Sequence, residues 1–115
     1  MIINLNQQLS NLLLGSGFYG TGGGGDPRLA KKIYLSLIKA KSKITLQCLQ
    51  KFNPDDLFIT VYTIGGLSQK PLKTPIINQA LAIYQKYLNK TISGIIPVEI
   101  GPLSLALAVK IAAKL

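Results

Sequence analysis

Residues 15–27 read GSGFYGTGGGGDP, a stretch that holds seven of the chain's eleven glycines. Because glycine loses more backbone entropy on folding than any other residue, this density predicts an irregular loop over residues 15–25. Asp26 followed by Pro27 combines an N-cap residue with a residue favoured in the first helical turn. The stretch therefore predicts a glycine-rich loop that leads directly into a helix.

Hydrophobic periodicity around this loop predicts alternating helices and strands. Apolar residues recur at helical spacing over residues 5–14, 27–40, 75–88 and 103–115. Strand patterns cover residues 43–49, 57–64 and 92–100. Residues 57–64 are largely apolar on both faces, which predicts a central strand. Pro97 predicts an edge position or a bulge for the last strand. This order predicts a single α/β domain over residues 1–115, with helices packed on a small mixed sheet.

The size and hydropathy of the chain indicate that it folds and that it still leaves apolar surface exposed to solvent. The 115 residues are 48% hydrophobic, and the mean hydropathy is +0.33. A domain of this size removes only about two-thirds of its unfolded surface from water. We therefore expect a homo-oligomer, or a partner in the form of a second domain or companion chain. The last helix has no stop signal, which suggests truncation before a C-terminal domain.

The number and distribution of charged residues indicate which classes of partner the chain favours. Thirteen basic residues against four acidic ones give a net charge of +9, yet Arg28 is the only arginine. Nucleic-acid binders favour arginine for bidentate contacts, and the lysines here are scattered along the chain. The pattern favours a solvated lysine-rich surface over a nucleic-acid or membrane surface.

Several kinds of chemistry are excluded by composition. The chain has no histidine, which rules out a Ser-His-Asp triad and a histidine metal site. The lone Cys48 lies in an expected strand and is interpreted as a small buried hydrophobe, consistent with a reducing cytoplasm.

No apolar run is long enough to span a membrane, so we expect a cytoplasmic protein. Asp55 and Asp56 have turn chemistry, so no metal site is expected, and the sequence identifies no cofactor.

The glycine-rich loop is the first candidate binding site. Main-chain N–H groups of consecutive glycines can turn toward one point, and a helix start adds its positive end. Such a loop can hold a phosphate, a carboxylate or a developing oxyanion. No Lys-Ser/Thr pair follows and no strand precedes, so it is neither a Walker loop nor a Rossmann fingerprint. The alternative is a tight packing crossover. The candidate substrate-binding residues are Thr21, Gly22, Gly23, Gly24, Gly25 and Asp26.

Glu99 is the candidate catalytic residue. It is the only glutamate of the chain and lies in the apolar segment Pro97–Gly101. Burying a carboxylate without a partner is costly, which suggests a functional reason such as general-base catalysis. The alternative is a capping or salt-bridge role. Gly65 and Gly66 follow an expected strand, where ligands collect in α/β proteins, although an ordinary turn explains them equally.

These motifs together resemble the S-methyl thiohydantoin desulfurase-like, hydantoinase-associated family. Its N-terminal domain carries GTGGGGDP, which stands here at Gly20–Pro27. The PDD turn at residues 54–56, the glycines after Ile64 and the PVEIG motif ending at Gly101 follow in the family's order. The resemblance implies a two-domain protein in which this α/β part precedes a β-rich domain. It further implies hydrolysis at the ring carbon of a small S-methylated thiohydantoin.

The chain departs from the family pattern at two places. The family continues EIGG-x-N, whereas Pro102 and Ser104 stand here in place of the second glycine and the asparagine. A Glu-Lys pair expected after the strand-end glycines is Gln69-Lys70. The resemblance therefore implies a hydrolase-like fragment that is inactive alone. The alternative hypothesis is a non-catalytic interaction module that covers its apolar surface by oligomerising through residues 103–115.

Overall fold

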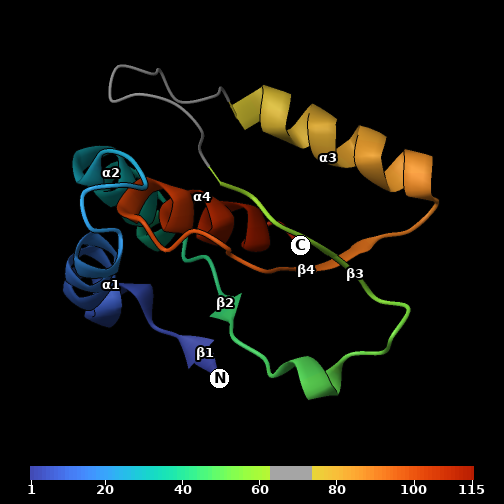
Figure 1. Cartoon of the computed structure of the whole chain (residues 1–115), viewed down its shortest axis with the longest axis horizontal. Coiled ribbons are helices and arrows are strands. Elements are labelled where there is room, and N and C mark those ends of the chain that lie inside the picture. The colour runs from blue at the N-terminus through green and yellow to red at the C-terminus, as the bar shows by residue number, and fades with distance from the viewer. Residues whose placement is uncertain (63–73) are drawn as a thin grey trace.

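The computed structural model describes residues 1–62 and 74–115 and confirms the α/β class (Figure 1). Three of the helices form a packed layer, two small sheets lie beside it, and a fourth helix stands apart. The elements, in chain order, are β1 (Ile2–Ile3), α1 (Leu5–Tyr19), α2 (Pro27–Lys39), β2 (Ile44–Thr45), a 3-10 turn (Leu49–Lys51), β3 (Leu57–Ile59), α3 (Thr74–Leu88), β4 (Ile92–Ile95) and α4 (Pro102–Ala112).

The hydrophobic core lies among α1, α2 and α4. Helix α4 packs mainly on α2, and both also contact α1. Ala30 of α2 and Ala106 of α4 are fully buried, so two helices can approach closely at this point. Leu5, Tyr34, Leu37 and Ile44 complete the buried cluster. The start of α2 confirms the sequence prediction, because Asp26 is its N-cap and Pro27 its first residue.

Helix α1 is longer than the glycine content suggested. It runs to Tyr19, so the expectation of an irregular loop from Gly15 was wrong. Ser16 lies in the middle of this extension, is 2% exposed, and donates its hydroxyl to the carbonyl of Leu12. Packing of this turn and continued helical hydrogen bonding outweigh the entropy cost of Gly15 and Gly17. Gly20 ends the helix as its C-cap, so the glycine loop proper covers residues 20–25.

The strands form two separate pairs and are shorter than predicted. β1 and β2 are antiparallel, with Ile3 opposite Ile44, whereas β3 and β4 are parallel, with Ile59 opposite Ile95. The predicted strand 43–49 is reduced to the two residues of β2, because β1 is its only pairing partner in the described part of the chain. Cys48 follows that strand and is exposed, which corrects its interpretation as a buried hydrophobe.

The predicted central strand is an edge strand in the described part of the chain. β3 ends at Ile59 and pairs there with β4 alone. Thr63 and Ile64 of the predicted strand lie outside the described residues. β4 ends before Pro97, whose missing N–H is therefore not required by the ladder.

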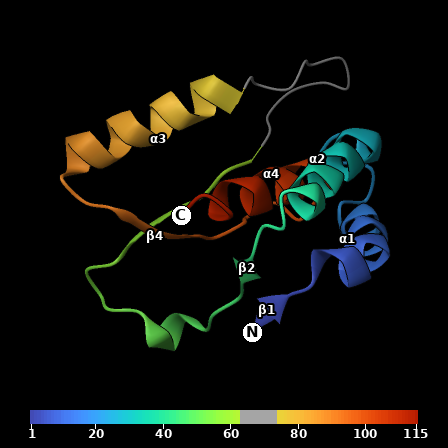
Figure 2. The same cartoon turned by 180° about the vertical axis from the view of Figure 1, so that it is seen from behind.

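Helix α3 confirms the predicted helix at 75–88 but stays outside the packed layer. Figures 1 and 2 show it apart from α1, α2 and α4 in both views. The side chain of Gln85 accepts a hydrogen bond from the N–H of Ile92, and Lys114 donates to Asn78.

Among the described residues, none of the helices combines the length and apolar character needed to cross a bilayer.

Candidate active site

The glycine loop turns back on itself through left-handed backbone conformations. Thr21 has φ 44°, and Gly22, Gly24 and Gly25 have φ 87°, 73° and 86°. Glycine adopts these angles at little cost, whereas a residue with a Cβ is strained there. The loop can therefore reverse direction between α1 and α2 within a few residues.

The inner side of this loop lies directly on the residues that precede α4. A Cβ atom placed on Gly24 would come 2.1 Å from the Cα of Gly101, and one on Gly101 would come equally close to Gly24. The two main chains thus touch where neither position has room for a side chain. The carbonyl of Gly24 also accepts hydrogen bonds from the N–H groups of Leu103 (2.8 Å) and Ser104 (3.1 Å). Gly24 therefore caps the start of α4 through its backbone.

Glu99 also contacts the start of α4. Its carboxylate oxygen Oε2 accepts a hydrogen bond of 2.8 Å from the hydroxyl of Ser104. Ser104 is completely buried, and Glu99 is half-buried rather than enclosed. One residue, Ser104, therefore binds the glycine loop through its N–H and Glu99 through its side chain. The structure brings Gly24, Gly101 and Glu99 together at the N-terminus of α4.

The backbone N–H groups of the loop differ in whether they have a protein acceptor. The N–H of Thr21 donates to the carbonyl of Phe18 in α1, and the N–H of Gly23 donates to the carbonyl of Gly20. Within residues 1–62 and 74–115, those of Gly22, Gly24 and Gly25 donate to no protein group. Gly22 and Gly23 are exposed, and a Cβ on Gly22 would meet open space. Close packing accounts for Gly24, Gly25 and Gly101, but it does not account for Gly22.

Asp26 is engaged in capping and ion pairing. Its carboxylate accepts from the N–H of Arg28 at 2.8 Å and forms an ion pair with the Arg28 guanidinium at 3.0 Å. The side-chain hydrogen bond from Arg28, followed by the backbone one, lowers the pKa of Asp26 below its ordinary value. Its negative charge is thus compensated locally, and Asp26 positions the start of α2 beside the loop.

Comparison with known proteins adds one finding. The sequence model described as S-Me-THD-like, N-terminal domain, matches residues 7–115, almost the whole chain. The chain belongs to this family. No curated protein and no solved structure matches it.

Ser104 is the site residue that sequence reasoning missed. It had been noted only as a departure from the family's asparagine, at the third position of α4. Its buried hydroxyl still supplies a hydrogen-bond donor to the family's carboxylate at Glu99. A polar residue inside the apolar run of residues 102–109 was the available signal, because a buried hydroxyl needs a partner.

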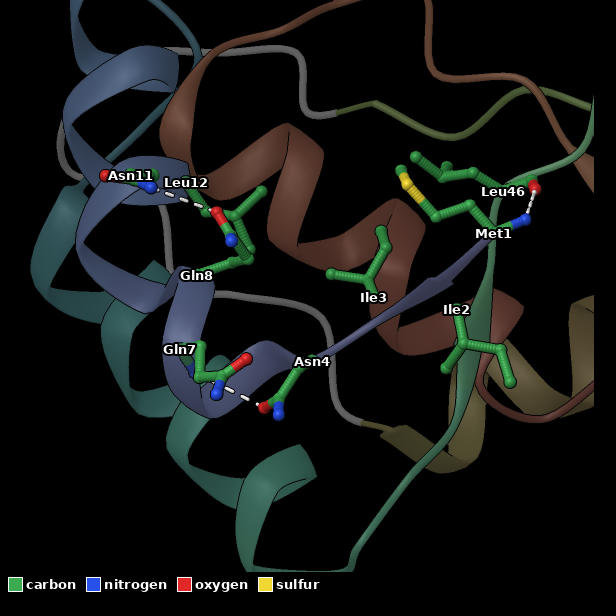
Figure 3. Close-up of a pocket in the computed structure, with 9 residues that line it drawn as sticks. All are labelled: Met1, Ile2, Ile3, Asn4, Gln7, Gln8, Asn11, Leu12 and Leu46. Atoms are coloured by element: carbon green, nitrogen blue, oxygen red, sulfur yellow. Dashed lines mark hydrogen bonds between the residues drawn. The ribbon is translucent and has the colours of Figure 1, made fainter.

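The other candidate residues and the pocket beside β1 are not part of this site. Gly65 and Gly66 lie outside the described residues. Among the described residues, no three His, Cys, Asp or Glu side chains gather where they could hold a metal ion. A shallow pocket of about 460 Å³ opens beside β1 and the first turns of α1 (Figure 3). Its lining comes from β1, Leu46 and the part of α1 that ends at Leu12, includes no residue of the glycine loop, and has amide groups as its polar side chains.

Proposed function

We propose that this domain contributes a general base and a set of backbone donors to the hydrolysis of small S-methyl thiohydantoin or hydantoin-type rings. The observation that carries the proposal is the shared attachment of Gly24 and Glu99 to Ser104. It supports a common location for the loop and the carboxylate. Membership of the S-Me-THD-like family supports the substrate class.

Glu99 serves in this proposal as the general base. Its Oε2 is held by Ser104, which leaves lone pairs of the carboxylate free to accept a proton from a water molecule. The oxygen of that water forms a bond to the ring carbon that carries the methylthio group. The carbon–sulfur bond then breaks, and the thiolate takes the proton held by Glu99 and leaves as methanethiol. The remaining hydroxyl proton passes to the adjacent ring nitrogen, so the ring carbon becomes a carbonyl. Water is the only co-reactant, and no atom changes its oxidation state overall.

The glycine loop serves as the charge-stabilising element. Addition of water to the ring carbon places negative charge on the adjacent ring nitrogen before the thiol leaves. Backbone N–H groups preorganised toward such a charge typically contribute a factor of 10²–10³ each. Gly22, Gly24 and Gly25 have unused N–H groups for this role within the described part of the chain.

We further propose that the domain is inactive alone and needs a second domain or a companion chain. Glu99 is only half-buried, and Gly22 and Gly23 are exposed. A site open to water on this side cannot strengthen its electrostatic interactions by excluding solvent. A covering partner would supply that exclusion.

The test has a binding part and a catalytic part. In the isolated chain, S-methyl thiohydantoin should shift the NMR signals of the Gly22, Gly24 and Gly25 amides in a saturable way. With a second domain from a family member added, methanethiol release should appear, and Glu99→Gln should lower kcat by about 10²–10⁴-fold. Asp55→Asn, the same chemical change in an exposed turn, is the control. An unchanged rate in Glu99→Gln would refute the general-base role.

A second candidate is a non-catalytic interaction module. The favouring observation is the apolar exposure of α3, where Ile83 is 68% and Tyr87 is 84% exposed. Sedimentation of the isolated chain discriminates between the candidates, because a monodisperse monomer that still binds the thiohydantoin would exclude self-association as its main function.

A further inference from the structure

A second hollow, separate from the glycine loop, lies between the two small sheets. It measures about 610 Å³. One wall is β2 with its following residues, and the other is β4 with Ile96 and Pro97. In both Figure 1 and Figure 2, β2 lies between β1 and β4, so the hollow faces the edge of β2 that β1 does not cover.

The floor of this hollow is one face of α4. Leu105, Ala108, Val109 and Ala112 line it and recur at helical spacing. The opposite face of α4 packs on α2. Two alanines in the floor leave room for a polypeptide backbone to approach the helix closely.

The wall formed by β2 presents unused backbone groups to the hollow. Met1 and Leu46 exchange two hydrogen bonds of 2.8 Å, so they form a hydrogen-bonded pair of the antiparallel ladder. The next pair, Ile2 and Thr45, is then of the non-hydrogen-bonded kind. The N–H and C=O of Thr45 therefore point away from β1, toward the uncovered edge.

The wall formed by β4 presents the matching groups. The N–H of Ile96 donates to the carbonyl of Ile59 at 3.0 Å, toward β3. Successive residues of a strand direct their backbone groups to opposite edges, so the N–H and C=O of Ile95 point away from β3. Thr45 and Ile95 both line the hollow, which makes it a gap between two open sheet edges.

The exposed surface of the chain as a whole, which includes that of α3, is large enough to leave area for a partner to cover. The chain exposes 8294 Å², whereas a free-standing domain of 12.4 kDa exposes about 6,100 Å². The excess of roughly 2,000 Å² exceeds the roughly 800 Å² per partner that a standard interface buries.

We propose that the hollow receives one extended segment of another polypeptide, which inserts between β2 and β4 and joins the two pairs into a five-stranded sheet. Backbone hydrogen bonds to Thr45 and Ile95 hold the segment, in the manner of strand addition. Alternate side chains of the segment are apolar and face α4. Among the described residues of the lining, Lys43 is the one charged side chain, and with the net charge of +9 it selects a segment with acidic residues at that end.

The same charge argues against a second copy as the occupant. Two chains of net charge +9 repel each other, and within residues 1–62 and 74–115 no acidic side chain lines the hollow to offset Lys43. The proposal does not involve Glu99 or the glycine loop, so it stands or falls separately from the proposed hydrolysis.

The test uses a heptapeptide of two aspartates followed by alternating valine and threonine, labelled with a fluorophore and titrated with the whole chain. We expect saturable binding, and at least tenfold weaker binding when the aspartates are replaced by lysines. Lys43→Glu should reverse this preference. A peptide with N-methyl groups on every second residue, which cannot donate to one of the two edges, should not bind.

Two matched variants locate the binding. Leu49 lines the hollow and is 62% exposed, whereas Leu14 is 74% exposed on α1, outside the lining. Leu49→Lys should weaken binding of the aspartate peptide at least tenfold, and Leu14→Lys should leave it unchanged, although both add the same charge. No saturable binding, equal binding of the N-methylated peptide, or self-association that Leu49→Lys abolishes would each overturn the proposal.

Discussion

Helices α2 and α3 are similar in length, but their surroundings differ. α2 buries Ala30, Tyr34 and Leu37 against its neighbours. From Ile76 to Leu88, α3 has no fully buried side chain, and Ile83 lies largely in solvent. Both helices place apolar residues at helical spacing along one face.

The difference arises from what each helix meets. α2 faces α4, where the small side chain of Ala106 allows close approach, and its first turn adjoins a glycine loop that fits against Gly101. Among the residues that the structure describes, α3 meets no such surface, and its side chains form hydrogen bonds at Asn78 and Gln85. Apolar periodicity therefore indicates that a helix forms, while small residues on a neighbouring element decide whether its apolar face becomes core.

The largest loss of stability is expected at the contact between Gly24 and Gly101, which holds the glycine loop against the start of α4. Gly24→Ala should destabilise the chain by about 4 kcal/mol, because a positive φ and a backbone clash with Gly101 act together. Gly22→Ala, which has the same kind of φ but open space around it, should cost only about 1–2 kcal/mol. Urea unfolding of both variants measures the difference. Equal losses would show that the loop is not seated on Gly101.

The contrast between the two helices can be measured directly. Leu37→Ala in α2 should lower the free energy of unfolding by about 3 kcal/mol, because it leaves a cavity in the core. Ile83→Ala in α3 should change it by less than about 0.5 kcal/mol, since that side chain is exposed. Chemical denaturation of the two variants is the measurement. A large loss at Ile83 would mean that α3 is packed against a partner or a second copy in solution.

The core of α2 contains one polar atom that does not contribute to stability. Within the described residues, the buried hydroxyl of Tyr34 has no hydrogen-bond partner, and burial raises its pKa to about 12. Tyr34→Phe should stabilise the chain by up to about 1 kcal/mol, because the desolvation cost of the hydroxyl disappears.

A pH series checks the same residue. The folded chain holds the Tyr34 proton more tightly than the unfolded chain, whose value is 10.0. Stability should therefore fall as pH rises from about 10 toward 12, and Tyr34→Phe should lack this contribution. Identical alkaline unfolding curves for the two proteins would point to a partner for the hydroxyl, such as a buried water.

The smallest expected effect lies at the start of α2. The pKa of Asp26 is lowered in the folded chain, chiefly by the Arg28 side chain, so its stabilisation is present above its ordinary pKa of 3.8 and lost as pH falls below it. Asp26→Asn keeps a good N-cap residue, so the melting temperature at pH 7 should change little. The fall in melting temperature between pH 5 and pH 2 should be shallower in this variant. If both proteins lose the same amount, the Asp26–Arg28 pair adds nothing to stability.

Local signals in the sequence predicted the parts of the fold that depend on neighbours along the chain. Asp26-Pro27 marked the start of α2, and the apolar repeat at 75–88 located α3. The strand prediction at 43–49 failed beyond Thr45 because alternation describes a suitable strand, whereas its length depends on a partner. The extent of α1 was also missed, because packing at Ser16 outweighs the intrinsic cost of two glycines.

The candidate site divides in the same way. The sequence by itself determined that positions 22–25 could adopt left-handed angles and that Glu99 was the sole glutamate in an apolar segment. Only the tertiary structure decided that Gly24 meets Gly101 and that Ser104 joins them to Glu99, because residues almost eighty positions apart come together only when α4 packs on α2. Conformational freedom is a property of each residue, whereas contact between distant residues is a property of how the helices pack.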